Sequence, residues 1–219
     1  SLNTNTTGGQ NVGLGYFSLY ANTTGAENVA VGANSLETNT TGASNVAMGW
    51  KALGLNTTAS GNTGLGNEAL RLNTTGASNT AVGSRALYVN TTGGQNVAVG
   101  NLALDANTTA NYNTAIGYQA LSTNTTGSHN TAVGTDVLLA TTTGIRNLGM
   151  GYQAGLALTT GGYNTFIGER AGKTQTTASE NVAIGSASLS TNTTGTGIVA
   201  IGKNALAAST TSGNNTAVG

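Results

Sequence analysis

The chain has 219 residues with seven Lys or Arg and seven Asp or Glu, so its formal net charge is zero and only 6% of residues are charged. Neutrality argues against nucleic acid or an anionic membrane surface as a partner, because both require a basic patch. No apolar run is long enough to cross a bilayer, so we expect no membrane insertion of this segment, and the absence of Cys excludes disulfides.

A 17-residue repeat runs through the chain without a single insertion or deletion. Its thirteen copies begin at residues 11, 28, 45, 62, 79, 96, 113, 130, 147, 164, 181, 198 and 215. We number its positions 1 to 17 from Asn11, and residues that share a position form a column. Loops of ordinary domains tolerate insertions, so a unit of constant length predicts coils that stack on their equivalents. We expect one continuous array over residues 1–219, uncapped at both ends and cut from a longer fibre.

Each copy opens with an expected strand over columns 1–5. These segments are residues 11–15, 28–32, 45–49, 62–66, 79–83, 96–100, 113–117, 130–134, 147–151, 164–168, 181–185, 198–202 and 215–219. Column 2 is β-branched except at Leu148, column 4 is always Leu, Val, Met or Ile, and the two columns share one face of a strand. With the Leu of column 9, we expect them to form the core, and we expect columns 1, 3 and 5 to face outward.

Two further features concern the backbone and the turns. Column 5 is Gly in every copy, which predicts a positive φ angle or a close backbone approach. Columns 13 and 14 are always Thr, column 12 is Asn in nine copies, and column 1 is Asn except at Ile198. Stacked Asn and Thr side chains can form ladders along a solenoid at about 4.8 Å spacing. The expected ladder residues include Thr74, Thr75, Thr91, Thr92, Asn79 and Asn96.

The nine Asn-Thr-Thr strings of column 12 are also formal N-glycosylation sequons. The repeat generates them automatically, so they say little about glycosylation. They would carry a rank of glycans only in a protein that passes through a glycosylating secretory pathway.

Charged and aromatic residues concentrate in the variable columns. All fourteen charges fall in columns 6, 7, 10 and 17, which we interpret as the solvent face. Aromatic rings beside polar groups can stack on sugars, whereas the simpler interpretation is that they only decorate the surface. The candidate binding residues are Tyr16, Phe17, Trp50, Tyr118 and Tyr152.

The strand segments carry no charge in any copy. An outer face of Asn, Ala and Gly suits close packing against other protein, and a closed ring of three copies is the natural case for a fibre. The alternative is that small residues merely permit a tight coil. The expected fold class is therefore all-β, a single-stack β-solenoid (β-roll) of thirteen 17-residue coils assembled as a parallel trimer.

The strings at residues 79–83, 113–117 and 181–185 (NTAVG, NTAIG and NVAIG) resemble the head repeats of trimeric autotransporter adhesins. Residues 113–121, followed by 124–127, are similar to repeats of bacteriophage tail-fibre-like and bacterial surface proteins. The resemblance implies a trimeric left-handed β-roll in an extracellular, cell-surface or virion fibre. It also implies a surface glycan or host receptor as a partner.

No residues converge as a catalytic, cofactor or metal site: the one His, His129, lies in a variable column and there is no Cys. We therefore expect a structural or adhesive fibre segment that is not an enzyme and has no cofactor. One alternative is an ice-binding solenoid that uses its stacked Thr ranks. Another is a subunit of a self-assembling extracellular filament or sheath.

Overall fold

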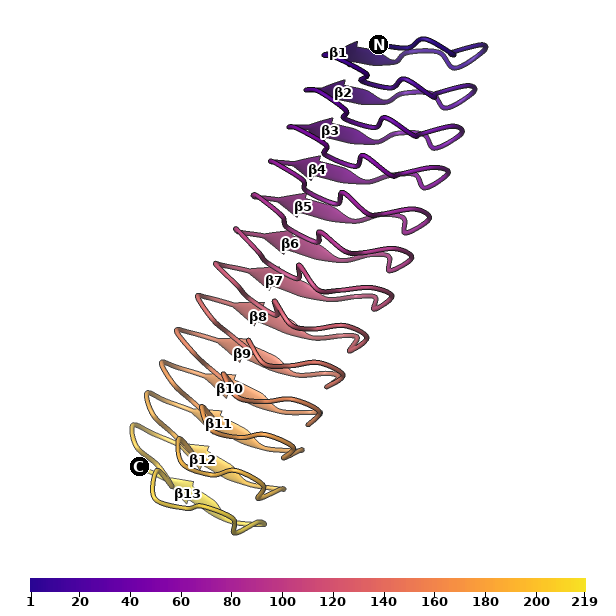
Figure 1. The fold of residues 1–219 in the computed structure, drawn as a ribbon. Coiled ribbons are helices and arrows are strands. Elements are labelled where there is room, and N and C mark those ends of the chain that lie inside the picture. Colours follow the sequence, from indigo (N-terminus) through magenta and orange to yellow (C-terminus); the bar gives the residue numbers. More distant parts are fainter. The chain divides into compact units, whose positions relative to one another are not determined.

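The computed structural model describes residues 1–219, which form only short β-strands and turns. Every strand consists of columns 2–4 of one copy (Figure 1). The strands are β1 (Val12–Leu14), β2 (Val29–Val31), β3 (Val46–Met48), β4 (Thr63–Leu65), β5 (Thr80–Val82), β6 (Val97–Val99), β7 (Thr114–Ile116), β8 (Thr131–Val133), β9 (Leu148–Met150), β10 (Thr165–Ile167), β11 (Val182–Ile184), β12 (Val199–Ile201) and β13 (Thr216–Val218). The chain divides into two compact units, residues 1–112 with β1–β6 and residues 113–219 with β7–β13.

Within each unit, each strand pairs in parallel with the strand of the next coil, and paired residues are seventeen apart. In the first unit Val12 pairs with Val29, and in the second Thr114 pairs with Thr131. The same offset holds in the turns, where the amide of Thr74 donates to the carbonyl of Thr91 at 3.0 Å. The predicted β-solenoid of 17-residue coils is therefore confirmed within each unit, whereas the trimer stays a prediction.

The strand side chains point the opposite way from the sequence-based expectation, which placed columns 2 and 4 in the core and column 3 on the outside. Column 3 points into the coil, and its residues Ala30, Ala47 and Ala81 are fully buried, whereas columns 2 and 4 point outward. A period of two places columns 2 and 4 on one face but does not say which face is inside. The interior already holds the Leu of column 9 and stacked Asn side chains, so only small residues fit in column 3 of the coils in which column 9 is Leu.

Column 1 forms an Asn ladder in the coil interior of both units, and column 12 forms a second one in the first unit, whereas Thr141, Leu158 and Gln175 interrupt column 12 in the second unit. Asn22 of column 12 donates from Nδ2 to Oδ1 of Asn5 at 2.8 Å and to the carbonyl of Gly25 at 2.9 Å. Asn11 of column 1 donates to that same carbonyl at 2.7 Å. Amides can fill this interior because nearly every donor finds a partner in its own coil or the next.

The strands cover columns 2–4 rather than the expected columns 1–5, and they end after column 4 because the backbone leaves the extended conformation at column 5. Gly49, for example, has φ +138°, and a Cβ added to it would lie 2.3 Å from the carbonyl oxygen of Gly66. Column 5 therefore combines a positive φ angle with a close approach to the backbone of the next coil, the two properties that its invariant Gly indicated.

The turns hold non-glycine residues in the left-handed region at columns 7, 9 and 17. Leu53 of column 9, for example, has φ +51° and is fully buried. Such a backbone costs on the order of 1 kcal/mol per residue, so the stacking of coils must offset strain in every coil. Nothing in the sequence indicated this, because Leu rarely adopts that conformation.

Candidate functional site: the outward face and its aromatic edge

The outward face, defined as columns 2 and 4, is an uncharged and largely apolar surface on every coil. Its side chains are Val, Thr, Leu, Met or Ile, and none is fully buried. Met48 is 46% exposed, Ile116 is 40% exposed and Met150 is 43% exposed. Isolated apolar residues on a surface are ordinary, but contiguous exposed rows of them mark interaction surfaces.

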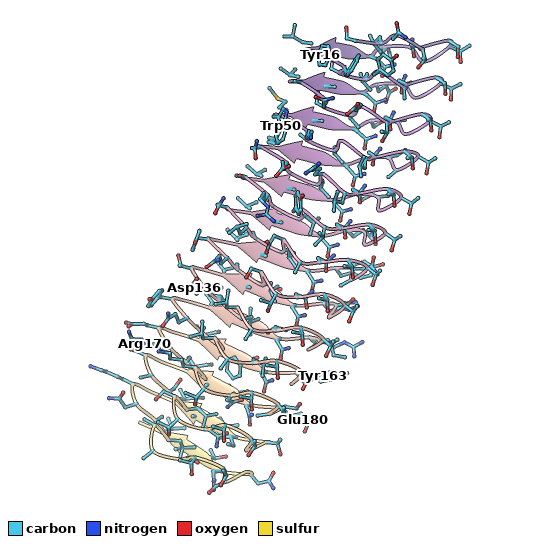
Figure 2. The ribbon with its side chains drawn as sticks, in the orientation of Figure 1. Tyr16, Trp50, Asp136, Tyr163, Arg170 and Glu180 are labelled. Atoms are coloured by element: carbon cyan, nitrogen blue, oxygen red, sulfur yellow. The ribbon has the colours of Figure 1, made fainter.

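Column 6 lies two residues after column 4, beyond the Gly of column 5, and we call it the aromatic edge. It holds four of the five candidate binding residues, and all four are exposed: Tyr16 by 69%, Trp50 by 45%, Tyr118 by 48% and Tyr152 by 45%. Figure 2 shows Tyr16 and Trp50 on the same edge of the first unit. The fifth candidate, Phe17 of column 7, is half-buried beneath Tyr16, with ring centroids 4.0 Å apart.

A polar network continues the same edge of the first unit through columns 7 and 10. Nη1 of Arg71 lies 2.6 Å from Oε1 of Glu68 and donates to the hydroxyl of Tyr88 at 3.0 Å. The guanidinium of Arg85 lies 4.5 Å from the centroid of the Tyr88 ring. The two Arg side chains and the Tyr88 ring therefore contact one another on the surface.

Asp105 ends this network and has a perturbed carboxyl group. Burial raises the pKa of Asp105 above its ordinary value of 3.8, while the attraction of Arg85 and a backbone hydrogen bond oppose the rise. A carboxylate that loses water without a close ionic partner is destabilised relative to its protonated form.

The structure separates the Thr ladder residues into two environments. The hydroxyl of Thr74 donates to the carbonyl of Thr91 at 2.9 Å, and that of Thr91 donates to Thr108 at 3.0 Å. Both lie in column 13 and are half-buried. In contrast, Thr75 and Thr92 of column 14 direct their side chains to solvent, as does every other Thr of that column.

Asn79 and Asn96 belong to the inner ladder of column 1 and are fully buried. The amide N–H of Asn96 donates to Oδ1 of Asn79 at 3.0 Å, and Nδ2 of Asn96 donates to the same atom at 3.2 Å. Their role is to satisfy the hydrogen-bonding groups of the coil interior, and neither residue is accessible to a ligand.

The sequons of column 12 are also inside the coil. Eight of the nine Asn residues are fully buried, namely Asn22, Asn39, Asn56, Asn73, Asn90, Asn107, Asn124 and Asn192, and Asn5 is exposed. A glycan needs the Nδ2 atom that these residues use inside the coil. The Asn side chains of these eight sequons are therefore interior in the folded protein, whereas the second Thr of each string is exposed.

The structure contains no enclosed pocket and no group of three or more His, Cys, Asp or Glu close enough to share a metal ion. None of its segments is a helix with the length and hydropathy needed to traverse a bilayer.

No family model, curated protein or solved structure matches this chain.

Sequence reasoning found the aromatic edge but missed the outward face. It placed the charge-free face on columns 1, 3 and 5, because bulky apolar residues were assigned to the core. The missed signal was the constant small size of columns 3 and 8, which are Ala, Gly or Ser in nearly every copy. Small buried residues in columns 3 and 8, together with the Leu of column 9, indicate a thin interior that cannot also hold two Val or Ile rows.

Proposed function

We propose that this chain is a structural segment of an extracellular fibre, without catalytic activity, whose copies associate laterally through the outward face. The observation that carries the proposal is the uncharged and largely apolar surface of columns 2 and 4, which recurs on every coil of both units. Burial of such a surface is the main favourable term in protein association.

A second copy of the chain is the partner that fits this face best. The face is periodic along each unit, and another copy has the same period. Rows of Val, Thr and Ile on two copies can then interdigitate coil by coil, as between packed sheets. A closed ring of three copies would leave none of these faces exposed.

The resemblance of the strings at 79–83, 113–117 and 181–185 to adhesin heads and tail fibres supports a location at a cell surface or on a virion. The low charge and the regular coils suit a role in which stiffness matters more than chemistry. An adhesive function would then use side chains outside the associating face.

The test is the oligomeric state of the purified chain. Light scattering after size exclusion should give a multiple of the chain mass of 21.5 kDa. The double variant Val82→Lys/Ile167→Lys places one charge on the outward face of each unit and should give the single-chain mass, because buried unpaired charges are costly. Thr75→Lys/Thr160→Lys places the same charges in column 14 and should leave the mass unchanged. A wild-type mass of one chain would overturn the proposal.

Ice binding is the second candidate, and one observation favours it. Every coil exposes the Thr of column 14, so each unit presents a regular rank of methyl and hydroxyl groups. The neighbouring Thr of column 13 cannot widen that rank, since its hydroxyl is donated to a carbonyl. Thermal hysteresis at high protein concentration would support this candidate, and its absence would exclude it.

A further inference from the structure

The aromatic edge carries the same spacing twice, once in each unit. In the first unit Tyr16 and Trp50 lie two coils apart, with the small Ala33 between them in the same column. In the second unit Tyr118 and Tyr152 are also two coils apart, with Thr135 between them. The repeat alone does not demand this, because column 6 otherwise holds Asn, Ser, Glu or Lys.

Hydrogen bonds beside the aromatic edge fix the spacing in the first unit. The carbonyl of Tyr16 accepts from the amide of Asn34 at 2.8 Å, and the carbonyl of Ala33 accepts from the amide of Lys51 at 3.0 Å. With an interstrand distance of about 4.8 Å, the two aromatic residues are held roughly 10 Å apart along the stack.

The second unit repeats this arrangement. The carbonyl of Tyr118 accepts from the amide of Asp136 at 3.0 Å, and the carbonyl of Thr135 accepts from the amide of Gln153 at 3.1 Å. Both pairs are therefore set by backbone ladders rather than by flexible loops.

The rings of the first unit are also supported from one side. Phe17 packs against Tyr16, and Nζ of Lys51 lies 4.4 Å from the centroid of the Trp50 ring. A supported aromatic ring loses little conformational entropy when it binds, and it offers a flat surface with polar atoms at its rim. Asn34 and Glu37 lie between the two rings along the stack, where Nδ2 of Asn34 donates to Oε2 of Glu37 at 2.9 Å.

These features define the ligand that would fit. Its contact surfaces must recur at two-coil intervals, must be flat and apolar on one side, and must have a polar rim. An extended glycan with β-1,4 linkages has those properties, since alternate sugars present the same face along a straight chain and a disaccharide has a comparable length. A helical glycan with α-1,4 linkages cannot align two sugars with both rings.

We propose that the aromatic edge binds extended β-1,4-linked glycan chains laid along the coils, with Tyr16 and Trp50 as one subsite pair and Tyr118 and Tyr152 as the other. Each ring stacks on one sugar, and the intervening sugar passes over Ala33 or Thr135. This binding goes beyond the structural role of the outward face and does not depend on it.

The experiment uses the full chain, with cellohexaose and chitohexaose as probes and maltohexaose as the control glycan. Trp50 is the only Trp in the chain, so its fluorescence reports on the first pair alone. We expect both β-linked probes to shift or quench its emission and maltohexaose to leave it unchanged.

Variants test the pairing. Tyr16→Ala retains Trp50 as the reporter and should weaken cellohexaose binding about tenfold, because it removes one of two stacking surfaces. Tyr118→Ala/Tyr152→Ala should leave the Trp50 response intact and reduce the calorimetric stoichiometry from two glycans per chain to one. Tyr163→Ala, an exposed Tyr of column 17 that Figure 2 shows on the other edge of the second unit, should change neither quantity.

Three outcomes would overturn the proposal. These are no response of Trp50 to either β-linked probe, an equal response to maltohexaose, and full retention of binding in Tyr16→Ala. A protein that is oligomeric but does not bind glycan would show that the edge is covered or inert, and would leave the proposed association of the outward face standing.

Discussion

Phe166 occupies the space that a side chain on Gly172 would need. A Cβ added to Gly172 would lie 2.5 Å from Cδ1 of Phe166, and one added to Gly155 would lie 2.7 Å from Cδ2 of the same ring. Phe166 replaces the usual Ala of column 3, and the two glycines replace the usual Leu of column 9. Three exceptions to the repeat are therefore one exchange, in which a single large ring occupies space that two Leu side chains take in other coils.

This exchange predicts strong coupling between the three positions. Phe166→Ala alone should destabilise the protein by about 3–5 kcal/mol, because it leaves a large interior cavity. Gly172→Leu alone should also destabilise it, since the new side chain meets the ring. The triple variant Phe166→Ala/Gly155→Leu/Gly172→Leu restores the usual repeat and should recover most of the loss, because Leu is held at the same φ in other coils. Urea denaturation followed by circular dichroism measures each step, and additive effects of the three changes would contradict the exchange.

The backbone of column 5 gives a second prediction. Gly49→Ala should destabilise the first unit by at least about 2 kcal/mol, since the new Cβ would combine a positive φ with a collision against the carbonyl of Gly66. Gly9→Ala is the matched control, because no atom lies within 4 Å of the added Cβ. It should be neutral or slightly stabilising. Thermal melting of both variants decides the matter, and equal melting temperatures would show that column 5 has no special requirement.

The period of the sequence is enough to predict the stack, because a constant 17-residue unit leaves no other way to satisfy identical columns. It is not enough to predict the interior. The alternation of side chains places Val29 and Val31 on one face of the strand and Ala30 on the other. Which of these two faces points into the coil depends on how much of the interior volume the opposite wall of the coil already fills. That wall holds Leu36 and Asn39, both fully buried, and their combined bulk is a property of the closed coil.

The candidate site was predictable to a similar extent. The exposed position of Trp50 and Tyr118 follows from their variable column, which also carries charges in other copies. Their two-coil spacing is visible in the sequence once the stacking is known. The left-handed backbone of Lys51, whose Nζ lies over the Trp50 ring, could not be predicted, because Lys has no preference for that conformation.

The buried Asn ladder of column 12 gives a third prediction, about glycosylation. Nδ2 of Asn73 donates to Oδ1 of Asn56 at 2.9 Å and to the carbonyl of Gly76 at 2.9 Å, so both of its hydrogens are used inside the coil. Folded protein secreted from a glycosylating host should therefore carry no glycan at the eight buried sequons. Peptide mass spectrometry after enzymatic deglycosylation measures each site, and Asn5, which is exposed, serves as the internal comparison. A glycan on Asn73 in a folded sample would contradict the assignment of its Nδ2 to hydrogen bonds inside the coil.

Asp105 gives a prediction about pH, and its sign follows from the cause of the shift. Because burial raises the pKa of Asp105 in the folded protein, the folded state holds this proton more tightly than the unfolded state does. The free energy of unfolding should therefore fall as the pH rises from the ordinary value of 3.8 through the folded pKa, and the loss should persist at neutral pH. Asp105→Asn keeps the shape without the charge, so it should raise the melting temperature at pH 7, and this gain should vanish below about pH 3.

Arg85→Gln provides the opposing test of the same carboxyl group. This variant removes the positive charge that lowers the pKa of Asp105 and so opposes the effect of burial. The pKa of Asp105 should therefore rise further, and the loss of stability should extend to higher pH. In the double variant Arg85→Gln/Asp105→Asn this added pH dependence should disappear, because no titrating carboxyl remains at that position. Melting curves of the wild type and the three variants across the acidic range give the comparison. If Asp105→Asn raised the melting temperature equally at every pH, the effect would come from packing, and the assignment of the shift to burial of a charge would be wrong.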